Sequence, residues 1–319
     1  PEPLKLLPVK AYVTIMEGCN NFCSFCVVPF VRGREKSRPR AEIIKEVRKL
    51  VTAGVKEVTL LGQNVNSYGA NMPGELSFAG LLKELNKING LERIRFTTSH
   101  PKDLSEELIS CFEYQPKLCP HIHLPLQSGS DRILKMMNRG YTREDYLLKI
   151  KKLRTVCPEI GITTDLIVGF PGETEKDFQA TLDMVTEIEY DEFFSFKYSD
   201  RPKTHASQYP DKLPEEEKAR RLSILQEKQQ SITLKKNRTL VGKTLAVLVE
   251  GRSKKSPLHV SGRSGTNKVV NFEGPLSLQG EIVLVKILTA HSHSLFGCLN
   301  MINCNKTISH YPKEVNDVH

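Results

Sequence analysis

The sequence contains no long uninterrupted apolar run. None of its windows approaches the roughly 18 apolar residues that a membrane-spanning helix needs, so a helical membrane protein is excluded. The first thirty residues hold charged and amide side chains and three cysteines, so no secretory signal is visible. The first residue is Pro1 rather than methionine, from which we expect a processed chain or a piece of a longer one.

No composition class is extreme either. Hydrophobic residues make up 39% and charged residues 26%, which excludes a disordered chain, a collagen-like fibre and a coiled-coil rod. A length of 319 residues is typical of about two globular domains. The net charge of +9 is therefore carried by an ordinary globular chain.

Cysteine is sparse, with eight in 319 residues, which is far from the density of a disulfide-stapled secreted domain. Cys19, Cys23 and Cys26 nevertheless lie within eight positions, and five others are scattered. A short loop with this C-x3-C-x2-C spacing is able to wrap one iron–sulfur cluster, and three ligands leave one iron open for a substrate. A structural zinc site is the alternative, but it needs a fourth ligand nearby, and the nearest histidine is His100.

Short β-rich runs alternate with amphipathic helical stretches over the first 213 residues. The predicted strands are residues 11–16, 57–61, 93–98, 121–126, 161–168 and 192–198. The predicted helices are residues 40–53, 78–88, 104–112, 132–137, 143–156 and 175–188. Alternating strands and helices indicate a mainly parallel sheet. Six units are too few for a closed eightfold barrel of about 250 residues, so the fold class is α/β with an open (partial) six-stranded parallel βα barrel at residues 1–213.

The residues after position 213 have a different sequence pattern. Residues 214–237 are highly charged and predict a long linker helix, and residues 303–319 predict a frayed tail. Between them, residues 238–302 contain four short alternating strands with Gly-rich turns, which predict a small all-β barrel. This segment holds eight Lys and Arg against three Glu and no Asp, so +5 of the net charge is concentrated there.

Four runs carry a resemblance to a known family. They are residues 16–39 (MEGCNNFCSFCVVPFVRGREKSRP), 60–69 (LLGQNVNSYG), 124–131 (LPLQSGSD) and 165–174 (DLIVGFPGET). The cysteine motif resembles that of radical S-adenosylmethionine (SAM) enzymes, and the four runs together resemble the methylthiotransferases. The GQNVN and VVPF contexts are most similar to the MiaB branch, which makes 2-methylthio-N6-isopentenyladenosine at position 37 of tRNA. The terminal β segment resembles a TRAM domain, a small RNA-binding barrel.

The resemblance implies a set of ligand roles. Cys19, Cys23 and Cys26 would hold one 4Fe–4S cluster whose open iron binds the amino and carboxylate groups of SAM. The remaining cofactor residues would be Phe25 on the adenine, Asp165 on the ribose, and Gly62, Gln63, Asn64, Gln127 and Ser128 at strand ends. Such positions are where α/β folds bind ligands. Simpler alternatives stay open: Asp165 as a turn cap and Phe25 as core.

Two groups of cations are candidates for RNA contact. Arg32, Arg34, Lys36, Arg38 and Arg40 alternate after the cysteine loop and would share one face of an extended segment. Arg252, Lys254, Lys255, Arg263 and Lys268 would form a second basic surface in the β segment. Phe272 and Phe296 are the only aromatic residues there, so recognition by charge and shape is favoured. A solvated charged surface is the alternative for both groups.

The resemblance also implies partners and a missing part. Family members carry a further N-terminal domain with three cysteines that hold an auxiliary 4Fe–4S cluster, and no second cluster spacing occurs here. We therefore expect one cluster and reductive SAM cleavage without sulfur insertion by this chain alone. Expected partners are the tRNA anticodon stem-loop, a flavodoxin- or ferredoxin-type electron donor and a sulfur carrier, in the cytoplasm or another reducing compartment. The alternatives are a methylthiotransferase for threonylcarbamoyl-adenosine or a ribosomal protein, and a non-catalytic RNA-binding protein with a structural metal.

Overall fold

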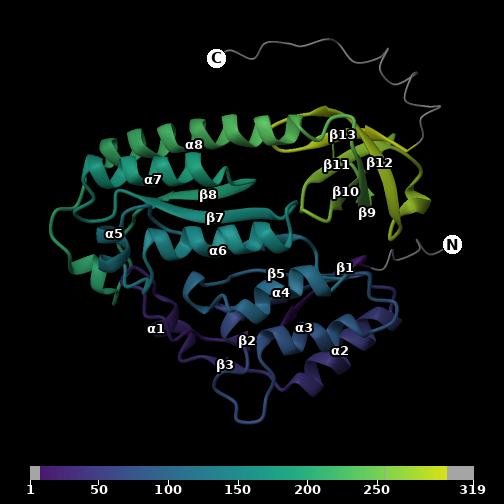
Figure 1. Ribbon diagram of the computed structural model, residues 1–319, viewed down its shortest axis with the longest axis horizontal. Helices are drawn as coiled ribbons and strands as arrows, with labels where there is room; N and C mark the ends of the chain where they lie inside the picture. Colours follow the sequence, from purple (N-terminus) through teal and green to yellow (C-terminus); the bar gives the residue numbers. More distant parts are fainter. Residues whose placement is uncertain (1–7, 255, 300–319) are drawn as a thin grey trace. The chain divides into compact units, whose positions relative to one another are not determined.

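The computed structural model describes residues 8–254 and 256–299, and it divides after Thr233 into two compact units (Figure 1). The division falls inside helix α8 (Glu215–Arg238), the predicted linker helix. The predicted tail at 303–319 and Lys255 lie outside the described residues. No described helix is both long and apolar enough to cross a membrane.

The first unit contains six parallel strands in two three-stranded sheets. One sheet has the order β1 (Lys10–Thr14), β4 (Glu57–Leu61), β5 (Arg93–Phe96), and the other β6 (His121–His123), β7 (Gly161–Val168), β8 (Glu192–Lys197). The sheets meet where Ile94 N donates to Lys117 O at 2.7 Å and Cys119 N donates to Ile94 O at 2.9 Å. The predicted six-stranded open parallel arrangement is confirmed, although its middle junction is a single bridge.

Helices follow the strands at the predicted places. They are α2 (Arg40–Thr52), α3 (Phe78–Asn86), α4 (Glu106–Tyr114), α5 (Asp131–Met136), α6 (Arg143–Val156) and α7 (Glu175–Ile188). Capping boxes at Thr142–Asp145 and Thr174–Asp177 fix where α6 and α7 begin, because each pair satisfies two otherwise free backbone N–H groups. Sequence patterning therefore placed these boundaries well.

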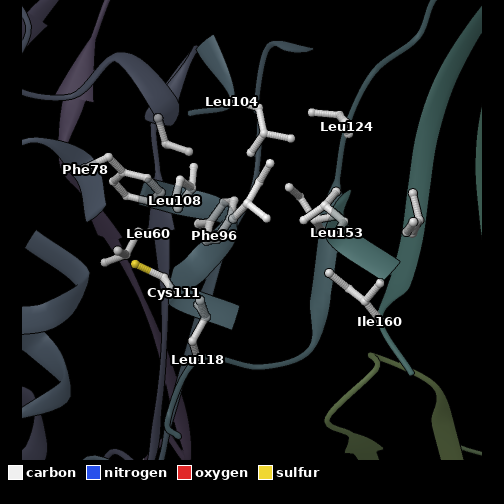
Figure 2. Close-up of a cluster of buried hydrophobic side chains, with 14 of the residues drawn as sticks. Leu60, Phe78, Phe96, Leu104, Leu108, Cys111, Leu118, Leu124, Leu153 and Ile160 are labelled. Atoms are coloured by element: carbon white, nitrogen blue, oxygen red, sulfur yellow. The ribbon is translucent and has the colours of Figure 1, made fainter. Parts of the chain in front are cut away.

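The core of the first unit lies between the strands and the helices. Phe78 of α3 meets Phe96 of β5 edge-on at 5.1 Å between ring centroids. Leu60, Leu108, Leu118 and other apolar side chains surround this pair (Figure 2). Alternate residues of each strand are buried in this core, so the other set faces the opposite side of the sheets.

Three short elements were not predicted. The short strands β2 (Met16–Glu17) and β3 (Lys36–Ser37) pair antiparallel, and α1 (Val28–Arg32) follows the cysteines. Their lengths of two to five residues are too short to show a period. They matter because they frame the cysteine loop. Short 3-10 turns lie at Val65–Ser67, Pro101–Asp103, His205–Gln208 and Leu276–Leu278.

The second unit is a closed five-stranded barrel. Its order is β10 (His259–Ser264), β11 (Val269–Glu273), β13 (Leu295–Cys298), β12 (Ile282–Ala290) and β9 (Thr244–Arg252). The sequence predicted four strands here and missed β13, which pairs with the distant β11 in parallel. Phe272 and Phe296 are buried, Phe272 in the barrel core, so neither is open for base stacking.

Candidate functional site: a cysteine loop beside buried polar strand ends

The cysteine loop is folded tightly between β2 and α1. Gly18 has a φ of +73°, and a Cβ there would lie 2.2 Å from Arg34 O, so only glycine fits. Cys19 N donates to Gly33 O at 3.3 Å and Cys26 N donates to Cys23 O at 2.9 Å. These backbone hydrogen bonds fix the conformation of the short loop that carries the three cysteines.

The three thiols are free and withdrawn from water. Cys23 is buried, and Cys19 and Cys26 are partly buried. Burial raises the pKa of Cys19, and negative charge on Cys23 or Cys26 would raise it further. Burial likewise raises the pKa of Cys26, with Cys23 adding to the effect. Three desolvated thiolates that repel one another are stabilised by a cationic metal group, so the donor set fits one.

The metal group that fits the three cysteines is larger than a single metal ion. In the described part of the chain, no three His, Cys, Asp or Glu side chains meet at the spacing that a single metal ion requires. The cysteine ligands of a four-iron cluster attach to different irons and therefore stand further apart than the ligands of one zinc ion. The three cysteines accordingly fit a 4Fe–4S cluster better than a zinc ion.

Unsatisfied polar atoms lie on this loop and just after β4 and β5, which share a sheet with the β1 strand that precedes the loop. Asn64 Nδ2 donates to Asp103 Oδ2 at 2.7 Å, yet its Oδ1 is buried. Several buried atoms lack a hydrogen-bond partner among the described residues: Ser24 Oγ, Gln63 Oε1, Asn64 Oδ1, Asn66 Oδ1, Ser99 Oγ and His100 Nε2. Buried polar atoms without partners are unfavourable, which makes them candidates for ligand contact. Most are acceptors, so they suit a ligand with N–H groups.

The glycine of the same run has a packing role. A Cβ on Gly62 would lie 2.4 Å from Met16 Cγ of the adjoining β2, so Gly62 lets that side chain approach. Gln63 is only partly buried and follows it directly. Packing therefore explains the glycine at position 62, but it does not explain the two amides that follow, Gln63 and Asn64.

Gln127 and Ser128 lie in the segment between β6 of the second sheet and helix α5. Gln127 has a φ of +73° and bridges to β7, its N donating to Asp165 O at 2.9 Å. Ser128 is fully buried, and its Oγ accepts from Ser130 N at 3.2 Å. Ser128 is therefore tied into the start of α5, and Gln127 is the more accessible of the two by 8% exposure against 0%.

Asp165 already has a partner that the sequence did not indicate. His123 Nε2 lies 3.4 Å from Asp165 Oδ2, and His123 Nδ1 lies 3.0 Å from Thr163 Oγ1. Phe194 faces the same histidine at 6.2 Å between ring centroids. Asp165 is thus part of a polar group on the face of β6, β7 and β8 opposite the core, and it is not a turn cap.

Phe25 contacts a small apolar cluster. It packs, partly exposed, against the cluster of Ile133, Met137, Phe170, Tyr198 and Ala206. Its remaining exposure leaves the adenine role open. The sequence missed this cluster, because its members come from four separate segments.

The basic stretch after the cysteines is corrected by the structure. Arg32 ends helix α1 and Arg40 begins α2, so only Lys36–Ser37 is extended and the five side chains do not alternate on one strand face. Arg38 Nη2 pairs with Glu46 at 2.8 Å, and Arg40 Nε lies 3.7 Å from Glu75. Arg34 instead stacks over Phe22 at 5.5 Å. Arg32 and Arg34 remain exposed beside the loop.

Three of the predicted cations of the second unit line one hollow. A hollow of about 620 Å³ is bordered by Arg252, Lys254 and Arg263 together with Asn271 and His293. Arg263 Nε lies 3.5 Å from Glu250 Oε1, while Arg252 and Lys254 are exposed. Lys268 is partly exposed and does not border this hollow. The hollow is therefore a basic, water-accessible surface.

Fold and loop together define the class of protein. Residues 13–185 match the radical SAM superfamily and residues 238–299 match the TRAM domain, so the chain belongs to the radical SAM superfamily. This membership implies a 4Fe–4S cluster and SAM. The radical SAM methyltransferase TsrM from Kitasatospora setae, solved with cobalamin and a [4Fe-4S] cluster, shares the fold with a TM-score of 0.53 and 20% identity, over 63% of this chain and 39% of that one.

Curated relatives narrow the family. A tRNA-2-methylthio-N(6)-dimethylallyladenosine synthase from Carboxydothermus hydrogenoformans is 51% identical over 93% of this chain and 68% of its own length. One of the same name from Syntrophus aciditrophicus is 57% identical over 93% of this chain and 65% of its own length. The chain belongs to this tRNA methylthiotransferase family, as the sequence motifs predicted. It spans about two thirds of the length of these relatives.

Proposed function

We propose that the protein transfers a methylthio group to C2 of N6-isopentenyladenosine (also called dimethylallyladenosine) at position 37 of tRNA by radical SAM chemistry. The observation that supports this most is the joint presence of the C-x3-C-x2-C loop and, just after β4, a set of buried amide oxygens without partners among residues 8–254 and 256–299. A basic barrel in the same chain supplies a surface of the charge that RNA requires.

In this proposal each group of residues has one task. Cys19, Cys23 and Cys26 hold one 4Fe–4S cluster, which with bound SAM supplies a 5′-deoxyadenosyl radical. Gln63 and Asn64 accept hydrogen bonds from the SAM amino group, because their buried oxygens have no hydrogen-bond partner in the part of the chain that the structure describes. Phe25, Gln127 and Ser128 form the wall of the cofactor site, and Gly62 leaves room for Met16 within it.

Asp165 needs a revised role within the proposal. Its carboxylate is near His123, so a ribose hydroxyl would share the carboxylate with the imidazole. A carboxylate has about four acceptor positions, so both contacts are compatible. We retain Asp165 as the ribose ligand, with His123 orienting it.

The RNA contacts are proposed on the same physical basis. Arg252, Lys254 and Arg263 would contact phosphates from the hollow of the second unit, with Lys255 and Lys268 contributing from the same segment. Arg32, Arg34 and Arg38 would contribute beside the cysteine loop. Arg38 is the weakest of these candidates because it is engaged by Glu46.

Further partners belong to the proposal as well. The anticodon stem-loop is the expected RNA element, a flavodoxin or ferredoxin the electron donor, and a carrier the source of sulfur. An auxiliary 4Fe–4S cluster in a longer form of the protein, the predicted domain boundaries and a reducing compartment remain predictions.

The decisive experiment has two arms. Nucleoside mass spectrometry of tRNA from cells with and without the full-length protein should show the methylthio group only with the protein; an unchanged profile would contradict the substrate. With this chain, anaerobic iron reconstitution followed by dithionite and SAM should release 5′-deoxyadenosine. Bound zinc without 5′-deoxyadenosine would instead support a non-catalytic RNA-binding protein.

A further inference from the structure

The connection between α5 and α6 holds the cysteine loop at three successive residues. Ser24 N donates to Met137 O at 3.0 Å. Asn138, with a φ of +57°, donates from Nδ2 to Phe22 O at 3.0 Å. Arg139 Nη1 then lies 3.3 Å from Cys23 Sγ. A connection far away in sequence therefore fixes the position of the middle cysteine.

Arg139 is held rigidly in a buried position. The side chain is 5% exposed, and its three nitrogens point to different acceptors. Nη2 donates to Pro125 O at 2.8 Å and Nε donates to the Tyr141 hydroxyl at 3.0 Å. The Tyr141 hydroxyl in turn donates to Leu126 O at 2.8 Å, so it is fixed as an acceptor for Arg139. The remaining nitrogen is thereby aimed at sulfur.

No carboxylate of the described residues balances the charge of Arg139. Across residues 8–254 and 256–299, no Asp or Glu forms an ion pair with this guanidinium, whose contacts are a carbonyl, a hydroxyl and the Cys23 sulfur. Burying an arginine without a counter-ion is costly. The loop of three cysteines is the anionic group within reach once the thiols are deprotonated. A buried cation that contacts Cys23 Sγ and has no acid partner among the described residues points to the cysteine sulfurs as its counter-charge.

We propose that Arg139 is a positioning and tuning residue for the cluster: it donates a hydrogen bond to the Cys23 sulfur and stabilises the extra negative charge when the bound cluster takes up an electron. The electron comes from an external one-electron donor, and no bond or proton is exchanged with Arg139. Hydrogen bonds and charge at cluster sulfurs set reduction potentials, and neighbours of metal ligands orient them. Removing the guanidinium should therefore make reduction harder.

The test is a potentiometric titration of the reconstituted chain, followed by electron paramagnetic resonance of the reduced cluster. Arg139→Met should lower the equilibrium constant for one-electron reduction about tenfold, which is about 59 mV. Arg139→Lys should recover part of this loss because it restores the charge without the fork of donors. The matched control is Arg143→Met, which removes an arginine that pairs with Glu187 on the helical side.

Each outcome of these measurements supports or overturns the proposed role of Arg139. An Arg139→Met potential equal to that of the unchanged chain overturns the inference. If Arg139→Met takes up too little iron to titrate, iron content decides: partial recovery in Arg139→Lys supports the role of charge, and no recovery in a natively folded Arg139→Lys overturns it. The inference rests on the cluster-binding part of the proposed function. If the unchanged chain itself takes up no iron, that function has failed, whereas a loaded chain with an unaffected variant contradicts the inference alone.

Discussion

The two compact units use polar side chains in opposite ways. In the first unit, the polar atoms just after β4 and β5 are neutral and buried, and several lack partners among the described residues. Around the hollow of the second unit, the side chains of Arg252 and Lys254 are charged and exposed. A dry site with few, fixed hydrogen bonds suits a small ligand that is recognised atom by atom. A wet basic surface suits a polyanion that is recognised by charge and shape.

The difference also explains which residues tolerate change. In the dry site an exchange of one atom removes a hydrogen bond that water does not replace. On the basic surface, water and salt take over part of each lost contact. Substitutions in the two regions test this contrast, and the largest effect is expected at the cluster cysteines.

Replacing a cluster cysteine should give the largest loss. Cys23→Ala should reduce iron uptake from about four atoms per chain to near zero, because three ligands are the minimum in this loop. Binding of tRNA should be largely kept. Iron and sulfide analysis measures the first property and a filter or anisotropy assay the second.

The matched control is Cys111→Ala, a buried free cysteine of the core (Figure 2). It should retain full iron content. Equal iron loss in both variants would mean that Cys23 has only a packing role, and close to eight irons in the unchanged chain would contradict a single cluster.

Removing two cations from the hollow should weaken tRNA binding by about tenfold. The double variant Arg252→Ala/Lys254→Ala should also make the salt dependence less steep, by roughly 0.7 in slope per lost phosphate contact on single-stranded RNA. The measurement is the dissociation constant at several salt concentrations. Lys243→Ala, an exposed lysine at the edge of β9 outside the hollow, is the control. An unchanged salt slope in the double variant would exclude the hollow as the RNA contact.

Truncating an amide in the dry site should lower SAM affinity by several-fold, with little effect on tRNA affinity. Gln63→Ala removes a buried oxygen that has no hydrogen-bond partner among the described residues, so it removes a ligand contact at small structural cost. Calorimetric titration with SAM checks it. Gln179→Ala, on the exposed face of α7, should have no effect. Unaltered SAM affinity in Gln63→Ala would place the amino group elsewhere.

The smallest effect concerns pH. Burial, with the charges of Arg139 and Lys102, lowers the pKa of His100 to about 2, so the folded chain keeps it neutral. The unfolded chain binds a proton near pH 6.5 and the folded chain does not, so the free energy of unfolding falls as pH drops below that value. The loss approaches about 1.4 kcal/mol per pH unit well below pH 6.5.

His100→Asn should abolish this part of the slope between pH 6.5 and 5.5 and leave the slope above pH 7.5 unchanged. Urea unfolding of both proteins in the same metal-loading state measures it. Parallel losses in the two proteins would show that His100 is able to take up a proton when folded.

The order of elements was readable from the sequence because it depends on local patterns. The β-rich runs and helical stretches of the sequence located β4, β7, α6 and α7 at their observed bounds. The spacing of Cys19, Cys23 and Cys26 indicated the metal group for the same reason, since all three lie on one loop. The elements that were missed, such as α1 and β13, are short, and β13 pairs with the distant β11.

The sequence by itself determined the strand and helix order, the cysteine motif, the family and the concentration of charge in the second unit. Only the tertiary structure decided which polar groups share a site. It paired Asp165 with His123, tied Ser128 into a helix start, and placed Arg139 against Cys23 across 116 positions of sequence. Local patterns reflect interactions within a few residues, whereas burial and counter-ions depend on groups that meet only when the sheets and helices are packed.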